Sequence, residues 1–257
     1  MKNNHFLFLL ITLLFISCNE KPKEKSEKTV PKAEENQTVG QMAKRHIESQ
    51  LSIPATEKYS YHIYKAHLDE DEKIDAIITL NRVDFALDEA STSKKTAKHA
   101  ELGFMGNYNY IFYFDGGLNK ISPPIAIPSS ALAELKITFE NIQSESYKDI
   151  LVDFRILNAS YKDYYTVSNH IPRRVFQWKN FDGLKSDVSE AYTFDYTDGT
   201  MGMVKDILVK KATLIQPSKD VDMYKYDPVL KESDEIVYRF FYHPDQGKYM
   251  TQKKNMK

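Results

Sequence analysis

Cysteine is almost absent from this sequence, because Cys18 is the only one among 257 residues. A single thiol cannot form a disulfide within the chain, although exported proteins often use disulfides. The region after Cys18 therefore holds no cysteine nucleophile and no thiolate zinc site. A fold built from that region must be stabilised by its hydrophobic core.

Glycine is also scarce, with nine residues, and the familiar catalytic signatures are missing from the sequence. There is no His-Glu-x-x-His, no Gly-x-Ser-x-Gly and no glycine-rich phosphate loop. Ser91 and Lys94 form a Ser-x-x-Lys pair, but it lies in a polar stretch without the companion motifs. The histidines are scattered singly, which is more typical of surface or hydrogen-bonded residues than of metal ligands. Whether the protein is an enzyme is left open by the sequence, which favours a protein without catalytic activity.

The sequence also has no large excess of positive or negative charge, since its formal net charge is −1 at pH 7. A nucleic-acid-binding domain needs a clustered basic surface, so we expect no nucleic-acid partner. Hydrophobic residues make up 42% and aromatic residues 12% of the chain, which is enough for a folded core.

The N-terminal apolar run, Phe6 to Ile16, is too short for a transmembrane helix, which needs about 20 residues. Lys2 and the amino terminus precede it with positive charge, as in the apolar region of a secretory signal. The run ends in Leu14-Phe15-Ile16-Ser17-Cys18. We therefore predict a signal peptide over residues 1–17. A plain signal with an incidental cysteine remains the alternative.

The residues before Cys18 resemble a bacterial lipoprotein signal, although Phe15 replaces the commoner leucine. This resemblance implies that Cys18 becomes the first mature residue and carries a diacylglyceryl thioether and an N-acyl chain of the palmitate type. Two or more acyl chains give stable membrane attachment. Asn19 is not the aspartate often linked with inner-membrane retention. The resemblance thus implies a lipid-anchored protein of the cell envelope, at the outer membrane, on its periplasmic or surface face.

The stretch 19–38 is rich in alternating lysine and glutamate and has almost no apolar side chains. Such a composition cannot bury enough apolar surface to offset the entropy of ordering, and Pro22 and Pro31 disfavour a helix. A flexible chain of this length has an end-to-end distance of about 25 Å. We expect residues 18–38 to be a lipidated cysteine and a disordered tether, and residues 39–257 to be a single domain.

That domain begins with an amphipathic pattern at helical spacing, ending before Pro54. Strand-like runs rich in β-branched and aromatic residues follow it. They include Tyr59–Tyr64, Ala76–Leu80, Tyr108–Phe114, Ile150–Ile156, Tyr164–Val167, Val175–Trp178 and Ile236–Tyr242. Asp115-Gly116-Gly117 is a hairpin-type turn signal, and His243 to Gly247 predicts a terminal hairpin. Residues 84–103 are polar and are expected to form a long loop or partial helix.

The pattern predicts a mainly β fold with antiparallel sheets, either a sandwich or an incomplete propeller, and one N-terminal helix. The turn after Tyr164–Val167, with His170, Arg173 and Arg174, is expected to be a polar loop between two strands.

Three polar stretches each end in an aspartate directly before an apolar run. The stretches are 67–75, 141–149 and 198–206. Oxygen-bearing side chains at alternate positions of a tight loop can point at a common centre, where calcium takes six to eight oxygens. Asp69, Asp71 and Asp75 have this spacing and are candidate calcium ligands. The alternative is a hairpin turn whose last aspartate makes local hydrogen bonds.

The first two stretches resemble degenerate FG-GAP or VCBS-type repeats, over Tyr59 to Asp115 and Phe139 to Trp178. This resemblance implies propeller-type blades of an extracellular binding protein, with calcium in the loops. The sequence departs from the pattern, since His67 replaces the leading carboxylate and Glu72 the turn glycine. The aspartates that end the three polar stretches, Asp75, Asp149 and Asp206, are also unevenly spaced along the chain, whereas repeat architectures keep a nearly constant period.

These features together favour a membrane-anchored envelope lipoprotein with a non-catalytic β domain that binds another protein or a polysaccharide. The alternative is a secreted hydrolase with an unrecognised acidic, metal-assisted site, in which Asp69, Asp71 or Asp75 acts with calcium or another metal.

Overall fold

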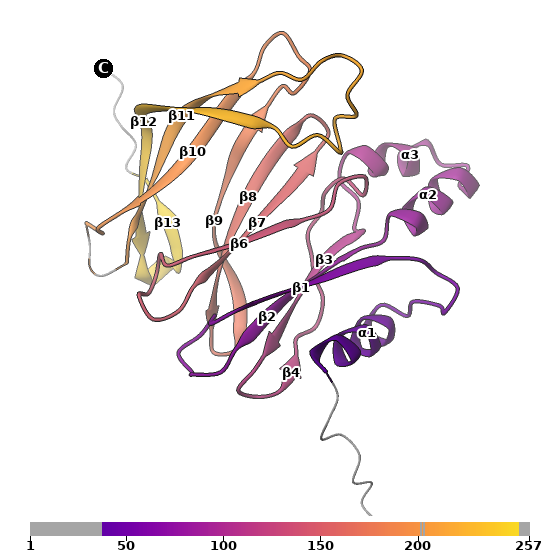
Figure 1. Ribbon diagram of the computed structural model, residues 1–257, viewed down its shortest axis with the longest axis horizontal. Helices are drawn as coiled ribbons and strands as arrows, with labels where there is room; N and C mark the ends of the chain where they lie inside the picture. Colours follow the sequence, from indigo (N-terminus) through magenta and orange to yellow (C-terminus); the bar gives the residue numbers. More distant parts are fainter. Residues whose placement is uncertain (1–37, 201, 203, 252–257) are drawn as a thin grey trace, which may run out of the picture. The chain divides into compact units, whose positions relative to one another are not determined.

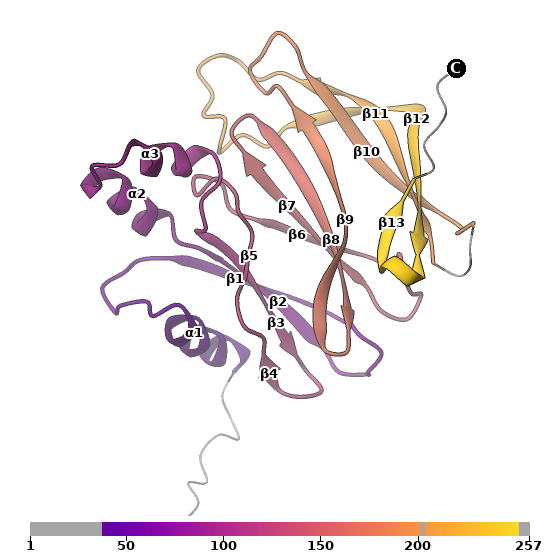
Figure 2. The ribbon, with the colours of Figure 1, turned by 180° about the vertical axis from the view of Figure 1, so that it is seen from behind.

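The computed structural model describes residues 38–200, 202 and 204–251. This part of the chain is mainly β, with two antiparallel sheets of five and eight strands, as predicted (Figures 1 and 2). Cys18 and most of the predicted tether lie outside the described residues. Among the described helices, none has the length and hydropathy required to cross a lipid bilayer.

Helix α1 (Val39–Gln50) is the predicted amphipathic helix. Thr38, assigned to the tether from the sequence, is its N-cap and forms a reciprocal capping box with Gln41. Such a box satisfies amide groups that the first helical turn leaves free. Ala43 and Ile47 are fully buried against the five-stranded sheet.

The five-stranded sheet has the order β1-β2-β3-β4, with β5 also paired to β3. Its strands are β1 (Ser60–Ala66), β2 (Asp75–Asn81), β3 (Asn109–Asp115), β4 (Lys120–Ile121) and β5 (Ile125–Ala126). Every residue of β2 is buried, because α1 covers one face of the sheet and the second sheet covers the other. This explains why Ala76–Leu80 is a nearly continuous apolar run and not an alternating one.

The eight-stranded sheet is a meander in which each strand pairs with the next along the chain. Its strands are β6 (Lys136–Glu140), β7 (Asp149–Ile156), β8 (Ala159–Ser168), β9 (Ile171–Asp182), β10 (Glu190–Thr197), β11 (Asp206–Ile215), β12 (Val229–His243) and β13 (Lys248–Met250). The short helix η1 (Pro244–Gln246) makes the predicted terminal hairpin between β12 and β13.

The two sheets pack face to face through one hydrophobic core, which matches the sandwich alternative. Ile77 and Ile111 of the first sheet share this core with Ile150 and Val152 of the second. The opposite face of β7 and β8 joins β9–β13 in a second, aromatic core around Tyr164. Figure 2 shows these strands side by side. The eight-stranded sheet therefore presents apolar residues on both faces.

The structure differs from the sequence-based expectation over residues 84–103 and around His170. Residues 84–103, expected as a loop or partial helix, form two short helices, α2 (Val83–Thr92) and α3 (Thr96–Gly103), so that α1 is not the only one. Neither has a side-chain N-cap, which weakened the helix signal. The expected loop around His170 is only a two-residue turn, and Ile171 to Arg174 already belong to β9.

Candidate functional site

The three polar stretches are hairpin loops of the same length. They join β1 to β2, β6 to β7 and β10 to β11, and each is followed by the aspartate that begins the second strand. Those aspartates, Asp75, Asp149 and Asp206, are each 1% exposed. Each pairs with the last residue before its loop, so the hairpins share one register.

In every loop, the closing aspartate accepts hydrogen bonds from backbone amides near the loop's beginning. Asp75 Oδ2 accepts from Leu68 N at 3.0 Å, Asp149 Oδ2 from Gln143 N at 2.7 Å, and Asp206 Oδ2 from Thr200 N at 3.2 Å. Charge-assisted bonds of this kind partly compensate the burial of a carboxylate, although Asp149 Oδ1 is buried without a hydrogen bond. The local hydrogen bonding considered as the alternative to calcium is therefore present in all three loops.

The loops also contact one another along one edge of the domain, at the left of Figure 1. Lys148 N donates to His67 O at 2.9 Å, and Lys205 N donates to Ile142 O at 2.9 Å. Segments far apart in the sequence are thereby joined in order, the first loop to the second and the second to the third.

The first loop carries the predicted carboxylates Asp69, Asp71 and Asp75, and the structure brings them together. Each offers an oxygen within 4.8 Å of the others. Asp71 N donates to Asp69 Oδ1 at 3.0 Å, and Lys73 N donates to Asp71 Oδ1 at 2.6 Å. Hard oxygen donors suit calcium, but three carboxylates supply only part of a shell of six to eight oxygens.

Burial raises the pKa of the Asp75 carboxyl above its ordinary value, and hydrogen bonds from the Gly116 and Leu68 amides partly offset this rise. The neighbouring carboxylates Asp69 and Asp71 raise the pKa further. A bound cation would favour the charged form of all three groups. Backbone amides and the Tyr113 hydroxyl, which donates to Asp69 Oδ2 at 3.0 Å, already satisfy part of the charge of the cluster.

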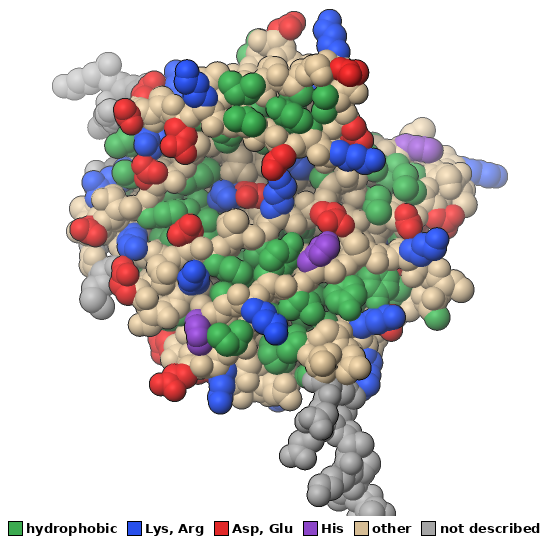
Figure 3. Space-filling view, viewed as in Figure 1, with side chains coloured by type: hydrophobic (Ala, Val, Ile, Leu, Met, Phe, Trp, Pro, Cys, Tyr) green, Lys and Arg blue, Asp and Glu red, His purple; other side chains and the backbone are tan. Residues whose placement is uncertain are grey.

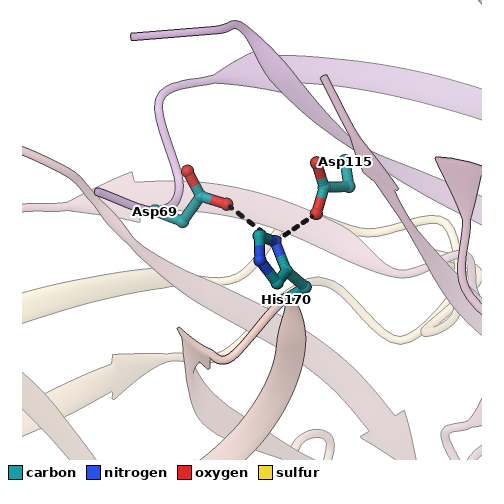
Figure 4. Close-up of side chains that lie close together, drawn as sticks. All are labelled: Asp69, Asp115 and His170. Carbon is teal, nitrogen blue, oxygen red and sulfur yellow. Dashed lines mark hydrogen bonds and ion pairs between the residues drawn. The ribbon is translucent and has the colours of Figure 1, made fainter. Parts of the chain in front are cut away.

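A histidine from the other sheet completes a second group, which sequence reasoning did not find (Figure 4). His170 Nδ1 lies 2.7 Å from Asp115 Oδ2 and 3.9 Å from Asp69 Oδ2. Asn169 and His170 both have positive φ, at 52° and 63°, in the two-residue turn between β8 and β9. Such a turn suits the strand twist of a hairpin, and it points His170 at the first sheet.

In the second loop, the side chain of Asn141 lies where three backbone carbonyl groups converge. Asn141 Nδ2 donates to the carbonyl oxygens of Ser144, Glu145 and Tyr147 at 3.1, 3.2 and 2.9 Å. The carbonyls that converge in this loop are therefore already satisfied by an amide. His67 begins the first loop as Asn141 begins the second, and its Nδ1 lies 3.0 Å from the carbonyl oxygen of Lys73.

A separate feature is a groove of about 910 Å³ on the face of the eight-stranded sheet, which we call the sheet groove. Figure 3 shows it as a hollow between β12 and β6, where acidic and basic side chains meet. Aromatic side chains of β10 line one side: Tyr192, Phe194 and Tyr196. Side chains of β6, among them Lys136 and Thr138, line the other.

The floor of the sheet groove is a connected polar network. Lys162 Nζ donates to Asp153 Oδ2 at 2.8 Å, and Asn180 Nδ2 donates to Asp153 Oδ1 at 2.8 Å and to Ser160 Oγ at 3.0 Å. These groups come from β7, β8 and β9, and their spacing in the sequence gave no signal of the network. The groove can therefore offer hydrogen bonds and aromatic faces to one ligand.

The two features lie apart, because no residue of the acidic cluster or its histidine, within the described ranges, lines the sheet groove. No family model, curated protein or solved structure matches this chain.

Proposed function

We propose that this protein is an envelope lipoprotein, held at a membrane through Cys18, whose β domain binds a polysaccharide or a protein segment without catalysing a reaction. The sheet groove is the observation that carries the proposal. It combines aromatic side chains and a hydrogen-bonding floor in one concave surface of about 910 Å³. Concavities of this kind are the common binding sites of proteins.

The binding test uses a protein immobilised without its acyl chains, as the Cys18→Ala variant, and exposed to solubilised envelope polysaccharides and proteins. Thr138 is exposed on β6 and lines the groove, so Thr138→Trp should fill it and abolish retention of the bound fraction. Thr213 is exposed on β11 outside the groove. Thr213→Trp is the matched control and should bind normally. Retention that survives Thr138→Trp would argue against the groove.

The anchor is tested separately by labelling growing cells with a radioactive fatty acid. The wild-type protein should be labelled and the Cys18→Ala variant should not. Label on the variant would contradict lipidation at Cys18.

A second candidate is a hydrolase that uses Asp69, Asp71 and Asp75 with a metal. Its supporting observation is that these carboxylates converge, with His170 beside them. Melting temperatures in calcium and in EDTA test the metal site that this candidate requires, with Asp71→Ala as the site variant and the exposed neighbour Glu72→Gln as control. A calcium-dependent rise that only Asp71→Ala loses would favour the metal site. If each protein melts at the same temperature in calcium as in EDTA, the metal site is ruled out.

A further inference from the structure

Strand β6 is the last strand of the eight-stranded sheet, and only β7 pairs with it (Figure 1). A strand with one neighbour directs about half of its backbone N–H and C=O groups away from that neighbour. Among the described residues, the backbone of β6 makes no hydrogen bond outside its pairing with β7. The outer edge of β6 is therefore open to another strand.

The side chains of β6 alternate between the two faces of its sheet. Ile137 is buried and Phe139 partly buried in the core between the sheets. Lys136, Thr138 and Glu140 are exposed and line the sheet groove on the other face. A strand added to this edge must match both faces, because a shift by one residue would place apolar side chains opposite polar ones.

The sequence of β6, Lys-Ile-Thr-Phe-Glu, is complementary to itself in the antiparallel direction. If Thr138 faces Thr138 of a second copy, Ile137 faces Phe139 of that copy and Lys136 faces its Glu140. Apolar pairs and opposite charges in facing positions stabilise antiparallel strands, whereas like charges destabilise them. A lysine on an edge strand commonly discourages pairing, but in this register a glutamate faces it and the charges attract.

Glu140 has no cation of its own chain to pair with. It makes no ion pair among the described residues, and its register partner on β7 is another acid, Asp149. Lys136 contacts Asp227, but the two side chains are 60% and 80% exposed, and ion pairs of this kind contribute little. Pairing of β6 with a second copy would bring Lys136 to Glu140 on both sides of the contact.

We propose that two copies of this chain pair antiparallel through β6, around a two-fold axis at Thr138, and so join two eight-stranded sheets into one. A two-fold contact uses the same patch on both copies and closes on itself. Because facing residues lie on the same face of a sheet, the sheet grooves of the two copies open on the same side. The dimer goes beyond the proposed function, which a monomer could also perform.

Two other strands have a free edge of useful length, β1 and β12, and neither has this complementarity. On β1, the register centred on Ile63 places Lys65 opposite Tyr61 and gives no pair of opposite charges. On β12, β13 already pairs with Phe241–His243. A second β12 centred on the exposed Val237 would need the same space. The charges and the topology therefore select β6.

The test measures self-association of the full-length Cys18→Ala variant, the parent, by sedimentation equilibrium over a micromolar concentration series. The parent lacks acyl chains, and a density-matched detergent prevents association through the apolar residues 6–16. A five-residue strand pair is a small interface, so we expect a dimer with a micromolar dissociation constant.

Lys136→Glu and Glu140→Lys each place like charges opposite one another and should weaken the dimer at least about tenfold. The double variant Lys136→Glu/Glu140→Lys restores opposite charges and should dimerise like the parent. Asp227→Asn, which removes only the ion pair within the chain, and Val237→Lys on β12 are the controls and should leave the dimer intact. All these side chains are at least partly exposed, so equal melting temperatures should show that each variant is folded.

A second measurement identifies the register. Thr138→Cys in the parent has a single cysteine, which faces its own copy across the two-fold axis at a separation that a disulfide can span. Mild oxidation should give a covalent dimer. Thr213→Cys, exposed on β11, is the matched control and should stay monomeric.

The inference fails if the parent stays monomeric over the whole series, if the dimer survives either charge reversal, or if the double variant does not regain it. Loss of the dimer in Val237→Lys would move the contact to β12. If Thr138→Cys links in cells to a different protein, that protein and not a second copy occupies β6. None of these results removes the sheet groove as a binding site, because each copy carries it.

Discussion

Gly116 and Gly117, in the turn after β3, have very different surroundings. A Cβ atom on Gly116 would overlap the main-chain carbonyl of Ile74. A Cβ atom on Gly117 would overlap Asp71 Oδ2, the end of a side chain that can rotate away. A side chain is therefore excluded at Gly116 by the backbone of Ile74 and at Gly117 by the carboxylate of Asp71.

Gly116→Ala should lower the free energy of unfolding by about 2 kcal/mol or more, because the backbone must move. Gly117→Ala should lower it by less than about 1 kcal/mol, because only Asp71 has to turn. Urea denaturation of both variants measures the difference. Equal losses would contradict the assigned contacts.

Asp149, which closes the second loop, has a pKa that burial raises to about 6 from an ordinary 3.8. The folded state therefore binds a proton more readily than the unfolded state between these values. The stability associated with this group is present below about pH 4 and is lost as the pH rises through about 6.

Relative to the wild type, Asp149→Asn should gain stability as the pH rises from 4 to 7, by up to about 3 kcal/mol. Asp187 is exposed, and Asp187→Asn serves as control. Urea denaturation at each pH gives the free energies of unfolding. A difference between Asp149→Asn and wild type that does not change with pH would refute the assignment.

At the scale of elements, the strongest periodic patterns were predicted correctly. The spacing of Val39 to Leu51 gave α1, and apolar runs gave β2, β3 and β7. The strands β4, β5, β6 and β10 and the helices α2 and α3 were not predicted as such, because neighbouring elements stabilise them more than their own sequence patterns do. The turn with His170 was predicted too long, since two residues in left-handed conformations suffice.

Helix α1 packs its apolar face against the five-stranded sheet, so substitutions on that face should lower the stability of the fold. Ile47 is fully buried, so Ile47→Ala should lower the free energy of unfolding by about 2–5 kcal/mol. Lys44 is exposed on the same helix, 3.9 Å from Glu48, and Lys44→Ala should cost less than about 0.5 kcal/mol. Thermal or urea unfolding distinguishes the two. A small loss for Ile47→Ala would mean that α1 is not docked as described.

At the scale of the whole molecule, the core between the sheets joins residues from β2 and β3 to residues from β7 and β8. The second core lies on the other face of the same strands β7 and β8. Because the two cores share strands, we expect the two sheets to unfold together.

Val152 is fully buried in the core between the sheets, whereas Trp178, the only tryptophan, packs in the second core. Val152→Ala should lower the free energy of unfolding by about 2 kcal/mol. Trp178 fluorescence and far-UV circular dichroism should report the same shifted midpoint. Separate midpoints for the two signals would show that the sheets unfold independently.

The sequence by itself determined the β class, the first helix and the three loops that end in aspartate. These depend on neighbours in the chain, through hydrophobic periodicity and local hydrogen bonds. The pairing of His170 with Asp115 and the floor of the sheet groove were decided only by the tertiary structure. They join residues of different strands, and these contacts exist only when the strands and sheets pack.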